Sequence, residues 1–291
     1  MGRFVNAVPL FGGGSLSART VRWVGRLDKG LVSGMCPFGK QLMLPITKTD
    51  RQQFGNDLEG DVNSVKVVQV LAHRGASKAE RENTVEAFRR AGTMGADGVE
   101  LDVRRTADDV LVVHHDARLR GRRAIRRLAA ADLPAYVPTL GQALDACAGM
   151  WVNLEIKNES PEPDFDPSEW VAEQTMALLA RRGEPERWLI SSFRMETIDR
   201  CRAIAPHIRT AWLTSRVPAD VVEQLRQRGH DALHPGVRRL TREIIEQCHA
   251  GGLQVNTWTC DDPDRMRELI EWGIDGICTN VPDVALKVLG R

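Results

Sequence analysis

The chain has 291 residues, with 40 basic and 39 acidic side chains, so its net charge is close to zero. This length allows one large α/β domain or two small ones, and the balanced charge gives no global reason to expect nucleic-acid binding. No apolar run is long enough to cross a bilayer as a helix. The six cysteines are scattered without a Cys-x-x-Cys pair, which predicts reduced thiols in a cytoplasmic protein rather than a zinc or redox motif.

Residues 1–64 differ in character from the rest of the chain. Three consecutive glycines at positions 12–14 and scattered polar residues interrupt this stretch, and no sustained helical or strand period emerges. We therefore predict a flexible or irregular N-terminal extension, followed by one domain over residues 65–291.

From residue 65 onward, short apolar runs alternate with helical patterns. Residues 67–72 are typical of a strand buried on both faces. A helix follows, with Asn83 as its predicted N-cap, Glu86 as the partner in a capping box and Gly95 at its end. Further strands are predicted at 98–103, 151–156, 188–192, 209–213, 232–234, 253–258 and 273–279, with a hairpin arm at 110–114. Further helices are predicted at 138–147, 168–182, 195–204, 219–228, 242–250 and 262–272.

Eight strands that alternate with helices over about 225 residues predict an α/β fold, the (β/α)8 or TIM barrel. A doubly wound open sheet is the alternative, because its pattern is similar up to the point where a barrel closes. In a barrel the C-terminal ends of all strands open into one mouth. Polar residues at these ends are therefore the candidates for a functional site.

Three carboxylates lie at the ends of the second and third predicted strands. Glu100 and Asp102 are two residues apart, so they face the same side of their strand. Glu155 ends the next strand and stands two residues before Lys157. An acidic pair alone is common on a solvated strand face, but the third acid favours a metal site. Carboxylate oxygens are hard ligands that suit one Mg²⁺ or Ca²⁺ ion.

Two histidines and two cations accompany these acids. His73 and Arg74 follow the first strand, and His115 follows the hairpin arm. Imidazole titrates near neutral pH, so the two histidines suit general acid–base work, although a lone histidine is usually structural. Arg74 and Lys157 would supply fixed positive charge to a phosphate. Together these groups predict metal-assisted cleavage of a small-molecule phosphodiester.

A series of short motifs carries a wider similarity. They are His73-Arg74-Gly75, Glu82-Asn83-Thr84, residues 95–103, His115-Asp116, Pro138-Thr139-Leu140, Glu155-Ile156-Lys157, Ser192-Phe193, Trp258-Thr259 and Thr279. In order and spacing they resemble the glycerophosphodiester phosphodiesterases over roughly residues 67–289. The resemblance implies a TIM barrel that uses a divalent metal and hydrolyses glycerophosphodiesters to glycerol 3-phosphate and an alcohol.

The same resemblance implies roles for individual residues. These are acid–base catalysis by His73 and His115, metal binding by Glu100, Asp102 and Glu155, phosphate binding by Arg74 and Lys157, and substrate contacts from Glu82 and Trp258, the latter as an aromatic wall.

Several positions depart from the family pattern. Arg81 stands where the family usually has proline, and Asp109 replaces a turn glycine, a mild change because Asp tolerates the left-handed conformation. Cys260-Asp261 replaces Val-Asn, and Asn280 replaces Asp. The last two changes lie at the predicted mouth, so they bear on which substrate is used.

Residues 118–127 contain six arginines and directly follow the His115-Asp116 motif. The simpler interpretation is a solvated basic face. The functional interpretation is a basic lip that draws anionic phosphodiesters or phospholipid head groups to the mouth, with weak contact to a membrane surface. Acidic residues within 159–166 could offset this charge from the neighbouring loop.

Three alternatives remain. A lysophospholipase D or a phospholipase C-like lyase acting on lipid phosphodiesters would need an apolar rim at the mouth. A non-catalytic phosphate-binding barrel would lack a catalytic group, and none is missing. An open-sheet nucleotide-binding protein would need a glycine-rich loop after the first strand, whereas residues 73–78 contain one glycine.

Overall fold

The computed structural model describes residues 5–9, 21–27, 30–36, 67–121 and 123–291. The chain divides into two units, residues 1–63 and residues 64–291. In the first unit, β1 (Val5–Pro9), β2 (Val21–Leu27) and β3 (Gly30–Cys36) form an antiparallel sheet. These three strands are not predicted from the sequence, because their apolar and polar residues show no sustained alternation. The remaining residues of the predicted extension lie outside the described ranges.

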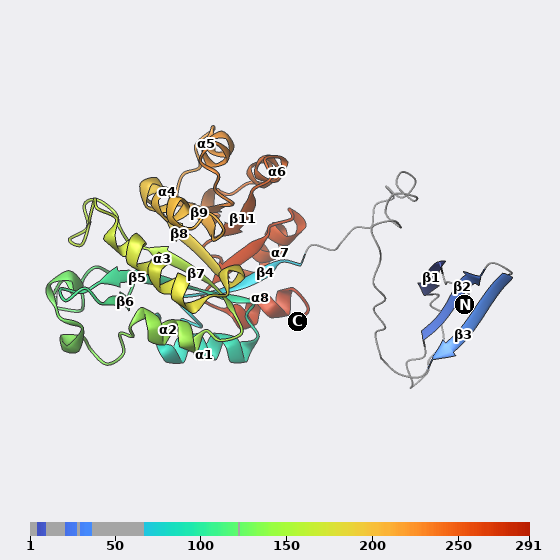
Figure 1. The fold of residues 1–291 in the computed structure, drawn as a ribbon, viewed down its shortest axis with the longest axis horizontal. Helices are drawn as coiled ribbons and strands as arrows, with labels where there is room; N and C mark the ends of the chain where they lie inside the picture. The colour runs from blue at the N-terminus through green and yellow to red at the C-terminus, as the bar shows by residue number, and fades with distance from the viewer. Residues whose placement is uncertain (1–4, 10–20, 28–29, 37–66, 122) are drawn as a thin grey trace. The chain divides into compact units, whose positions relative to one another are not determined.

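The second unit is a closed barrel of eight parallel strands (Figure 1). The strands are β4 (Gln69–His73), β5 (Gly98–Arg105), β7 (Trp151–Ile156), β8 (Trp188–Ser192), β9 (Arg209–Thr214), β10 (Ala232–Pro235), β11 (Gln254–Thr257) and β12 (Gly276–Thr279). Each pairs in parallel with the next, and β12 returns to β4, with Ile277 opposite Val70. This closure confirms the TIM barrel and excludes the open sheet.

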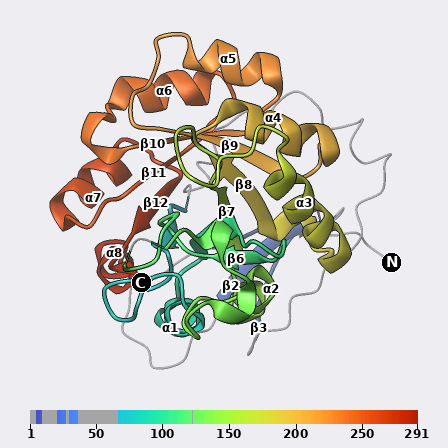
Figure 2. The same cartoon turned by 90° about the vertical axis from the view of Figure 1, so that its left-hand side faces the viewer.

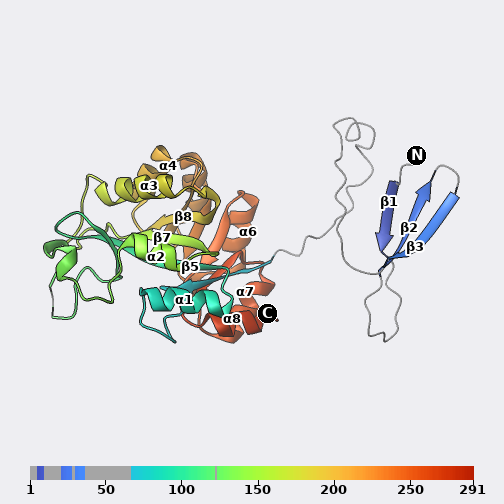
Figure 3. The ribbon, with the colours of Figure 1, turned by 60° about the horizontal axis from the view of Figure 1, so that its bottom comes forward.

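Helices surround the strands (Figure 2). They are α1 (Val85–Met94), α2 (Leu140–Ala146), α3 (Trp170–Arg182), α4 (Met195–Ile204), α5 (Val221–Arg228), α6 (Arg242–Ala250), α7 (Pro263–Glu271) and α8 (Pro282–Val288), with short 3-10 helices η1 (Ile125–Arg127), η2 (Ala130–Asp132), η3 (Pro185–Arg187) and η4 (Val237–Arg239). Figures 1 and 3 place α8 beside α1, so the last helix of the ring packs next to the first. Helix α8 is not predicted from the sequence, because its seven residues make too few turns to show a helical period of apolar residues.

The start of α1 corrects one prediction. The N-cap is Thr84, whose hydroxyl accepts the Ala87 N–H at 3.2 Å, so the predicted Asn83 cap is wrong by one residue. Asn83 adopts a left-handed conformation with φ of 57°, and its side-chain amide donates to Asp102 Oδ2 at 2.7 Å. Gly95 ends the helix in a left-handed conformation, as predicted.

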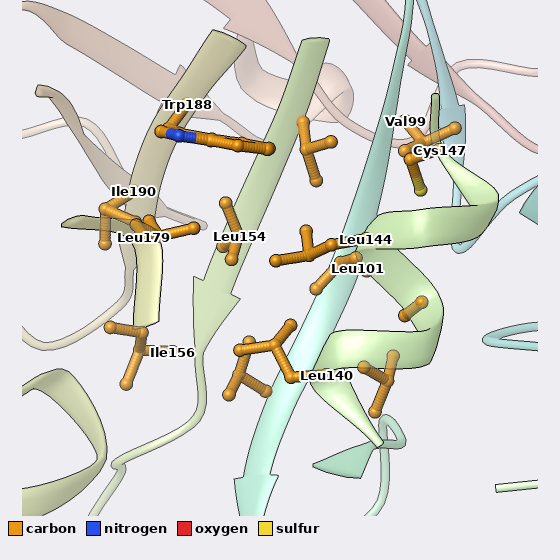
Figure 4. Packing of buried hydrophobic residues seen from close by; sticks show 14 of the residues in the cluster. Val99, Leu101, Leu140, Leu144, Cys147, Leu154, Ile156, Leu179, Trp188 and Ile190 are labelled. Atoms are coloured by element: carbon orange, nitrogen blue, oxygen red, sulfur yellow. The ribbon is translucent and has the colours of Figure 1, made fainter. Parts of the chain in front are cut away.

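Strand alternation separates the core from the mouth. Val99, Leu101 and Val103 of β5 point outward into a core shared with α2, and Figure 4 shows Leu101 facing Leu144 of that helix. Because side chains alternate along a strand, Glu100 and the residues two positions away from it point into the barrel. At the opposite end of the barrel, where the strands begin, the ring of Trp151 occupies the interior. A Cβ atom at Gly98 would lie 2.7 Å from this ring.

The predicted hairpin arm is confirmed as β6 (Leu111–Val113), antiparallel to β5. Asp109 supplies the turn with φ of 63°, the left-handed conformation that glycine usually provides. The hairpin delivers His115 to the end of the barrel at which β4 and β5 terminate, since the His114 N–H donates to the Asp102 carbonyl at 3.0 Å.

Within the described residues, no helix is long and apolar enough to span a membrane. The side chains of five cysteines are described, and these five are free and buried: Cys147, Cys201, Cys248, Cys260 and Cys278.

Candidate active site

A pocket of about 110 Å³ lies at the C-terminal ends of the strands. The predicted site residues that line it are His73, Arg74, Glu100, His115, Glu155, Lys157 and Trp258. The structure also places Asp102 beside it, with Oδ1 at 3.2 Å from Lys157 Nζ. Glu82 does not line this pocket, but its carboxylate accepts a hydrogen bond from Arg74 at 2.9 Å. The fold therefore brings all the predicted groups together.

The three acids form a compact buried cluster. Glu100, Asp102 and Glu155 each offer a carboxylate oxygen, and these oxygens lie within 4.8 Å of one another. Glu100 Oε2 accepts the Arg74 backbone N–H at 2.9 Å, whereas Glu100 Oε1 is buried without a hydrogen-bond partner. Lys157 forms an ion pair with Glu155 as well as with Asp102.

Burial and mutual repulsion perturb these carboxyls. Burial, followed by repulsion from the other two acids, raises the pKa of Glu100 well above its usual value. Burial also raises the pKa of Glu155 to about 7, against the attraction of Lys157. Burial alone would raise the pKa of Asp102 too, but Lys157, His115 and Arg74 hold it well below the usual value. Three buried acids beside two cations leave excess negative charge, which a divalent ion would offset. The all-oxygen donor set fits Mg²⁺ and Ca²⁺ alike.

Asn280 orients the imidazole ring of His73 through a hydrogen bond. Its Nδ1 lies 2.7 Å from Asn280 Oδ1, and since an amide oxygen only accepts, Nδ1 carries the proton. The orientation of this amide follows from its Nδ2, which donates to Asp261 Oδ2 at 2.7 Å. Nε2 of His73 is left free, 3.9 Å from Glu100 Oε2. Burial, and then the charge of Arg74, lowers the pKa of His73.

Two departures from the family pattern prove to be partners. The family commonly has Asn where this chain has Asp261, and Asp where it has Asn280. Asp261 accepts hydrogen bonds from the Asn280 side chain and backbone at 2.7 and 2.8 Å, and from Thr279 at 2.9 Å. The carboxylate and the amide have therefore exchanged places across one hydrogen bond. Sequence spacing alone could not reveal this, because 19 positions separate Asp261 from Asn280.

His115 is anchored through both its ring and its backbone. Nδ1 lies 2.8 Å from Asp116 Oδ1, which leaves Nε2 available. The His115 carbonyl accepts from Arg104 Nε at 2.9 Å, and Arg104 is fixed by Glu162 and Asp164, both at 2.7 Å. Burial lowers the pKa of His115, although Asp102 acts in the opposite direction. Arg104 was missed, but its signal was present, because it continues the inward alternation of Glu100 and Asp102.

Within the described residues, the acidic loop at 159–166 forms ion pairs with two arginines of β5. Two of its acids pair with Arg104, as described above, and Asp166 pairs with Arg105 at 3.1 Å.

Trp258 forms an aromatic wall together with Phe193. Their rings meet edge to face, with centroids 5.4 Å apart. The Trp258 indole N–H donates to the His234 carbonyl at 2.8 Å, which fixes the ring. Phe193 belongs to a motif noted in the sequence, but no role was predicted for it. The wall gives the pocket an apolar surface beside Lys157, whose Nζ lies 5.9 Å from the centroid of the Phe193 ring.

His234 also lines the pocket but is held neutral. Its Nε2 accepts from Asn256 Nδ2 at 3.0 Å, and complete burial, with a further contribution from Arg209, lowers its pKa to about 3. Because the unfolded chain binds a proton near pH 6.5 and the folded chain does not, this histidine reduces stability as the pH falls from 6.5 toward 3. His234 therefore serves the fold in its neutral form.

The substitution His234→Gln retains an acceptor for Asn256 and removes this titration. We expect the unfolding free energy of the wild type, relative to the variant, to fall by about 2 kcal/mol between pH 7 and pH 5. Urea unfolding at both pH values, in the presence of chelator, measures this difference. A difference that does not change with pH would show that His234 is not held neutral.

Comparisons with known proteins place the chain in a family. The model of the glycerophosphoryl diester phosphodiesterase family matches residues 73–284. A protein of Caldanaerobacter subterraneus named glycerophosphodiester phosphodiesterase is 29% identical over 246 residues, which cover 76% of this chain and 98% of that protein. A protein of the same name from Bacillus subtilis is 27% identical over 263 residues, covering 79% of this chain and 89% of that protein.

Solved structures agree. An Oleispira antarctica phosphodiesterase in complex with the product sn-glycerol-3-phosphate superposes with a TM-score of 0.72 at 25% identity, over 77% of this chain and 98% of that chain. A glycerophosphodiester phosphodiesterase from Parabacteroides distasonis has a TM-score of 0.69 at 27% identity, over 77% and 97% of the two chains. Because the family model spans well over half of the sequence and the barrel and its polar mouth agree with it, this chain belongs to the glycerophosphoryl diester phosphodiesterase family.

Proposed function

We propose that the protein hydrolyses glycerophosphodiesters to glycerol 3-phosphate and an alcohol, with His73 and His115 as the acid–base pair. The observation that supports this best is the convergence of two imidazoles on one pocket, each anchored through Nδ1 and free at Nε2. The names of the relatives and the product bound in the Oleispira enzyme point to the same reaction.

The metal would be held by Glu100, Asp102 and Glu155. When bound, a divalent ion supplies Lewis-acid polarisation of a phosphoryl oxygen and neutralises charge that develops on it. Arg74 and Lys157 would grip the remaining phosphate oxygens from fixed positions, because both are tied to the acid cluster. Glycerol would lie against Trp258, and Glu82 would hold the Arg74 guanidinium.

The protons can be balanced over two steps. In the first, one imidazole takes the proton from the glycerol hydroxyl next to the ester, which attacks phosphorus. The other imidazole gives its proton to the departing alcohol oxygen, and a cyclic phosphate results. In the second step water opens the ring, and the two histidines exchange roles, which restores the starting protonation state.

Release of glycerol 3-phosphate tests this proposal. We would assay glycerophosphocholine, glycerophosphoethanolamine and glycerophosphoglycerol with Mg²⁺, Ca²⁺, Mn²⁺ or EDTA. Release that depends on a metal would establish the reaction. Absence of release with every metal would contradict it, and lysophospholipids would then be tried before the non-catalytic phosphate-binding barrel is accepted.

A water-soluble substrate fits this mouth better than a lipid. Among the described residues, the large exposed hydrophobic side chains are Val67 and Ile204, and neither lines the pocket. The apolar residues of the arginine-rich segment, Leu119, Ala124 and Ile125, are buried in the protein and cannot anchor it in a bilayer. Contact with a membrane would therefore be weak and electrostatic. We also propose a cytoplasmic location, because the described cysteines are free.

Removal of the Asn280 side chain should impair the orientation of His73. We expect Asn280→Ala to lower kcat about tenfold or more, because His73 Nδ1 loses its acceptor. Asn280→Asp alone places two carboxylates face to face, whereas adding Asp261→Asn restores the arrangement common in the family. The double variant should therefore recover most of the activity. Wild-type kcat in Asn280→Ala would exclude the positioning role.

A further inference from the structure

A second cavity, of about 270 Å³, adjoins the first at His115. We call it the arginine pocket. Its lining comprises Arg81, Glu82, Asn83, His114, His115, Asp116, Arg118, Arg120 and Tyr136. His115 is the residue that lines both pockets. A group that contacts the free Nε2 of His115 therefore lies where the two cavities meet.

The acids of the arginine pocket already have partners. Glu82 accepts from the Arg74 guanidinium at 2.9 Å, and Asp116 lies 2.8 Å from His115 Nδ1. The nearby loop at 159–166 is engaged by Arg104 and Arg105. The acids of the pocket are thus engaged by residues other than Arg81 and Arg120.

Arg81 is held in place without being neutralised. Its guanidinium stacks on the ring of Tyr136, 3.9 Å from the centroid. Neither Arg81 nor Arg120 forms an ion pair within the part of the chain that the structure describes. Stacking occupies the face of a guanidinium and leaves the N–H groups at its edge, which match the oxygens of phosphate or carboxylate.

We propose that the arginine pocket binds the leaving alcohol and favours alcohols that carry an anionic group, either phosphate or carboxylate. This inference rests on the proposed function. With glycerol against Trp258 and the phosphodiester at Lys157, the alcohol oxygen reaches His115 and the rest of the alcohol enters the neighbouring cavity. An anion there meets Arg81 and Arg120.

Two substrates that differ by one phosphate test the proposal. Glycerophosphoglycerol has glycerol as its leaving group, and the matched diester carries a terminal phosphate on that glycerol. We expect kcat/KM to be about tenfold higher for the phosphate-bearing diester, the effect of a charge-assisted hydrogen bond. Arg81→Gln should remove this preference, because it should lower kcat/KM about tenfold more for the phosphate-bearing diester than for glycerophosphoglycerol, whose leaving group has no anion.

Arg238→Gln provides a control with the same charge change. Arg238 is exposed and lines a different cavity, which shares Trp258 with the first pocket. It should leave the preference intact. If both variants reduce the preference equally, the mouth acts through its overall field and the proposed pocket is wrong. Tyr136→Phe keeps the ring under Arg81 and should retain the preference, whereas Tyr136→Ala should weaken it.

Further outcomes separate this inference from the proposed function. Equal kcat/KM for both diesters would overturn the inference while the phosphodiesterase reaction stands. If neither diester is cleaved, calorimetry with His73→Ala and Mg²⁺ still measures both Kd values, and equal values would overturn the inference. If the protein instead uses this charge to bind a membrane surface, Arg81→Gln and Arg238→Gln would weaken binding to phosphatidylglycerol vesicles equally, and no preference among soluble diesters would be seen.

Discussion

Replacing His73 or His115 with alanine is expected to lower kcat for glycerol 3-phosphate release by about 100-fold or more. The pocket lining described here contains one further imidazole, that of His234. His234 is buried and held neutral, so it cannot replace either ring. Without one of them, either the attacking hydroxyl keeps its proton or the alcohol must leave as an alkoxide. Stopped-time assays of glycerol 3-phosphate at saturating substrate measure the loss.

The two losses should not add. His73 and His115 serve successive proton transfers of one reaction, so the double variant should be close to the worse single variant. His207→Ala is the matched control, since His207 is exposed and lines none of the cavities described. Its kcat should equal that of the wild type. Near-normal turnover in either pocket variant, with an unchanged circular dichroism spectrum, would refute the assignment.

Removal of the metal, or of one of its ligands, is expected to have a comparable effect on activity. EDTA should abolish glycerol 3-phosphate release, and Glu100→Gln should weaken Mg²⁺ binding and lower kcat by about 100-fold. Glutamine keeps an oxygen for the Arg74 N–H but removes one negative charge from the cluster. Calorimetric titration with Mg²⁺ and the release assay measure the two effects. Full activity in excess chelator would exclude the metal site.

Although Glu100→Gln should lower activity, it should raise the stability of the metal-free protein. Without metal, Glu100→Gln removes repulsion among three buried acids, so it should raise the free energy of unfolding by about 1–2 kcal/mol. Adding Mg²⁺ should raise the melting temperature of the wild type more than that of the variant. Glu246→Gln, an exposed change in the middle of α6, should alter neither quantity. A destabilised variant without metal would argue that Glu100 is held by the fold rather than kept for an ion.

Much of the architecture could be predicted because it depends on local pattern. The bounds of α4 and α6 match the predicted helices, since apolar residues at helical spacing and clear end signals mark both. The end of α1 was predicted from Gly95, but its start was assigned to Asn83 instead of Thr84. Both residues are good caps, and the choice between them depends on Asp102, which lies on another strand and takes the Asn83 amide.

The predicted site residues could be found because strand alternation is also a local property. Residues two apart on β5 share a face, which places Glu100 and Asp102 together in any fold that keeps the strand. The residues that orient the histidines cannot be found in this way, because they lie far from the histidines in the sequence. Asn280 reaches His73 across 207 positions of sequence, and Arg104 reaches Asp164 across 60, so these contacts exist only after the barrel has closed.

The sequence by itself determined the alternation of strands and helices, the ends of the strands that carry acids and imidazoles, and the kind of chemistry these groups can perform. Hydrophobic period and side-chain chemistry are properties of neighbouring residues, and a sequence shows them directly. The tertiary structure alone decided that β12 pairs with β4, that Asp261 and Asn280 are partners, and that Arg81 lies on Tyr136 beside His115. These features arise from contacts between distant segments, whose formation depends on the packing of the whole barrel.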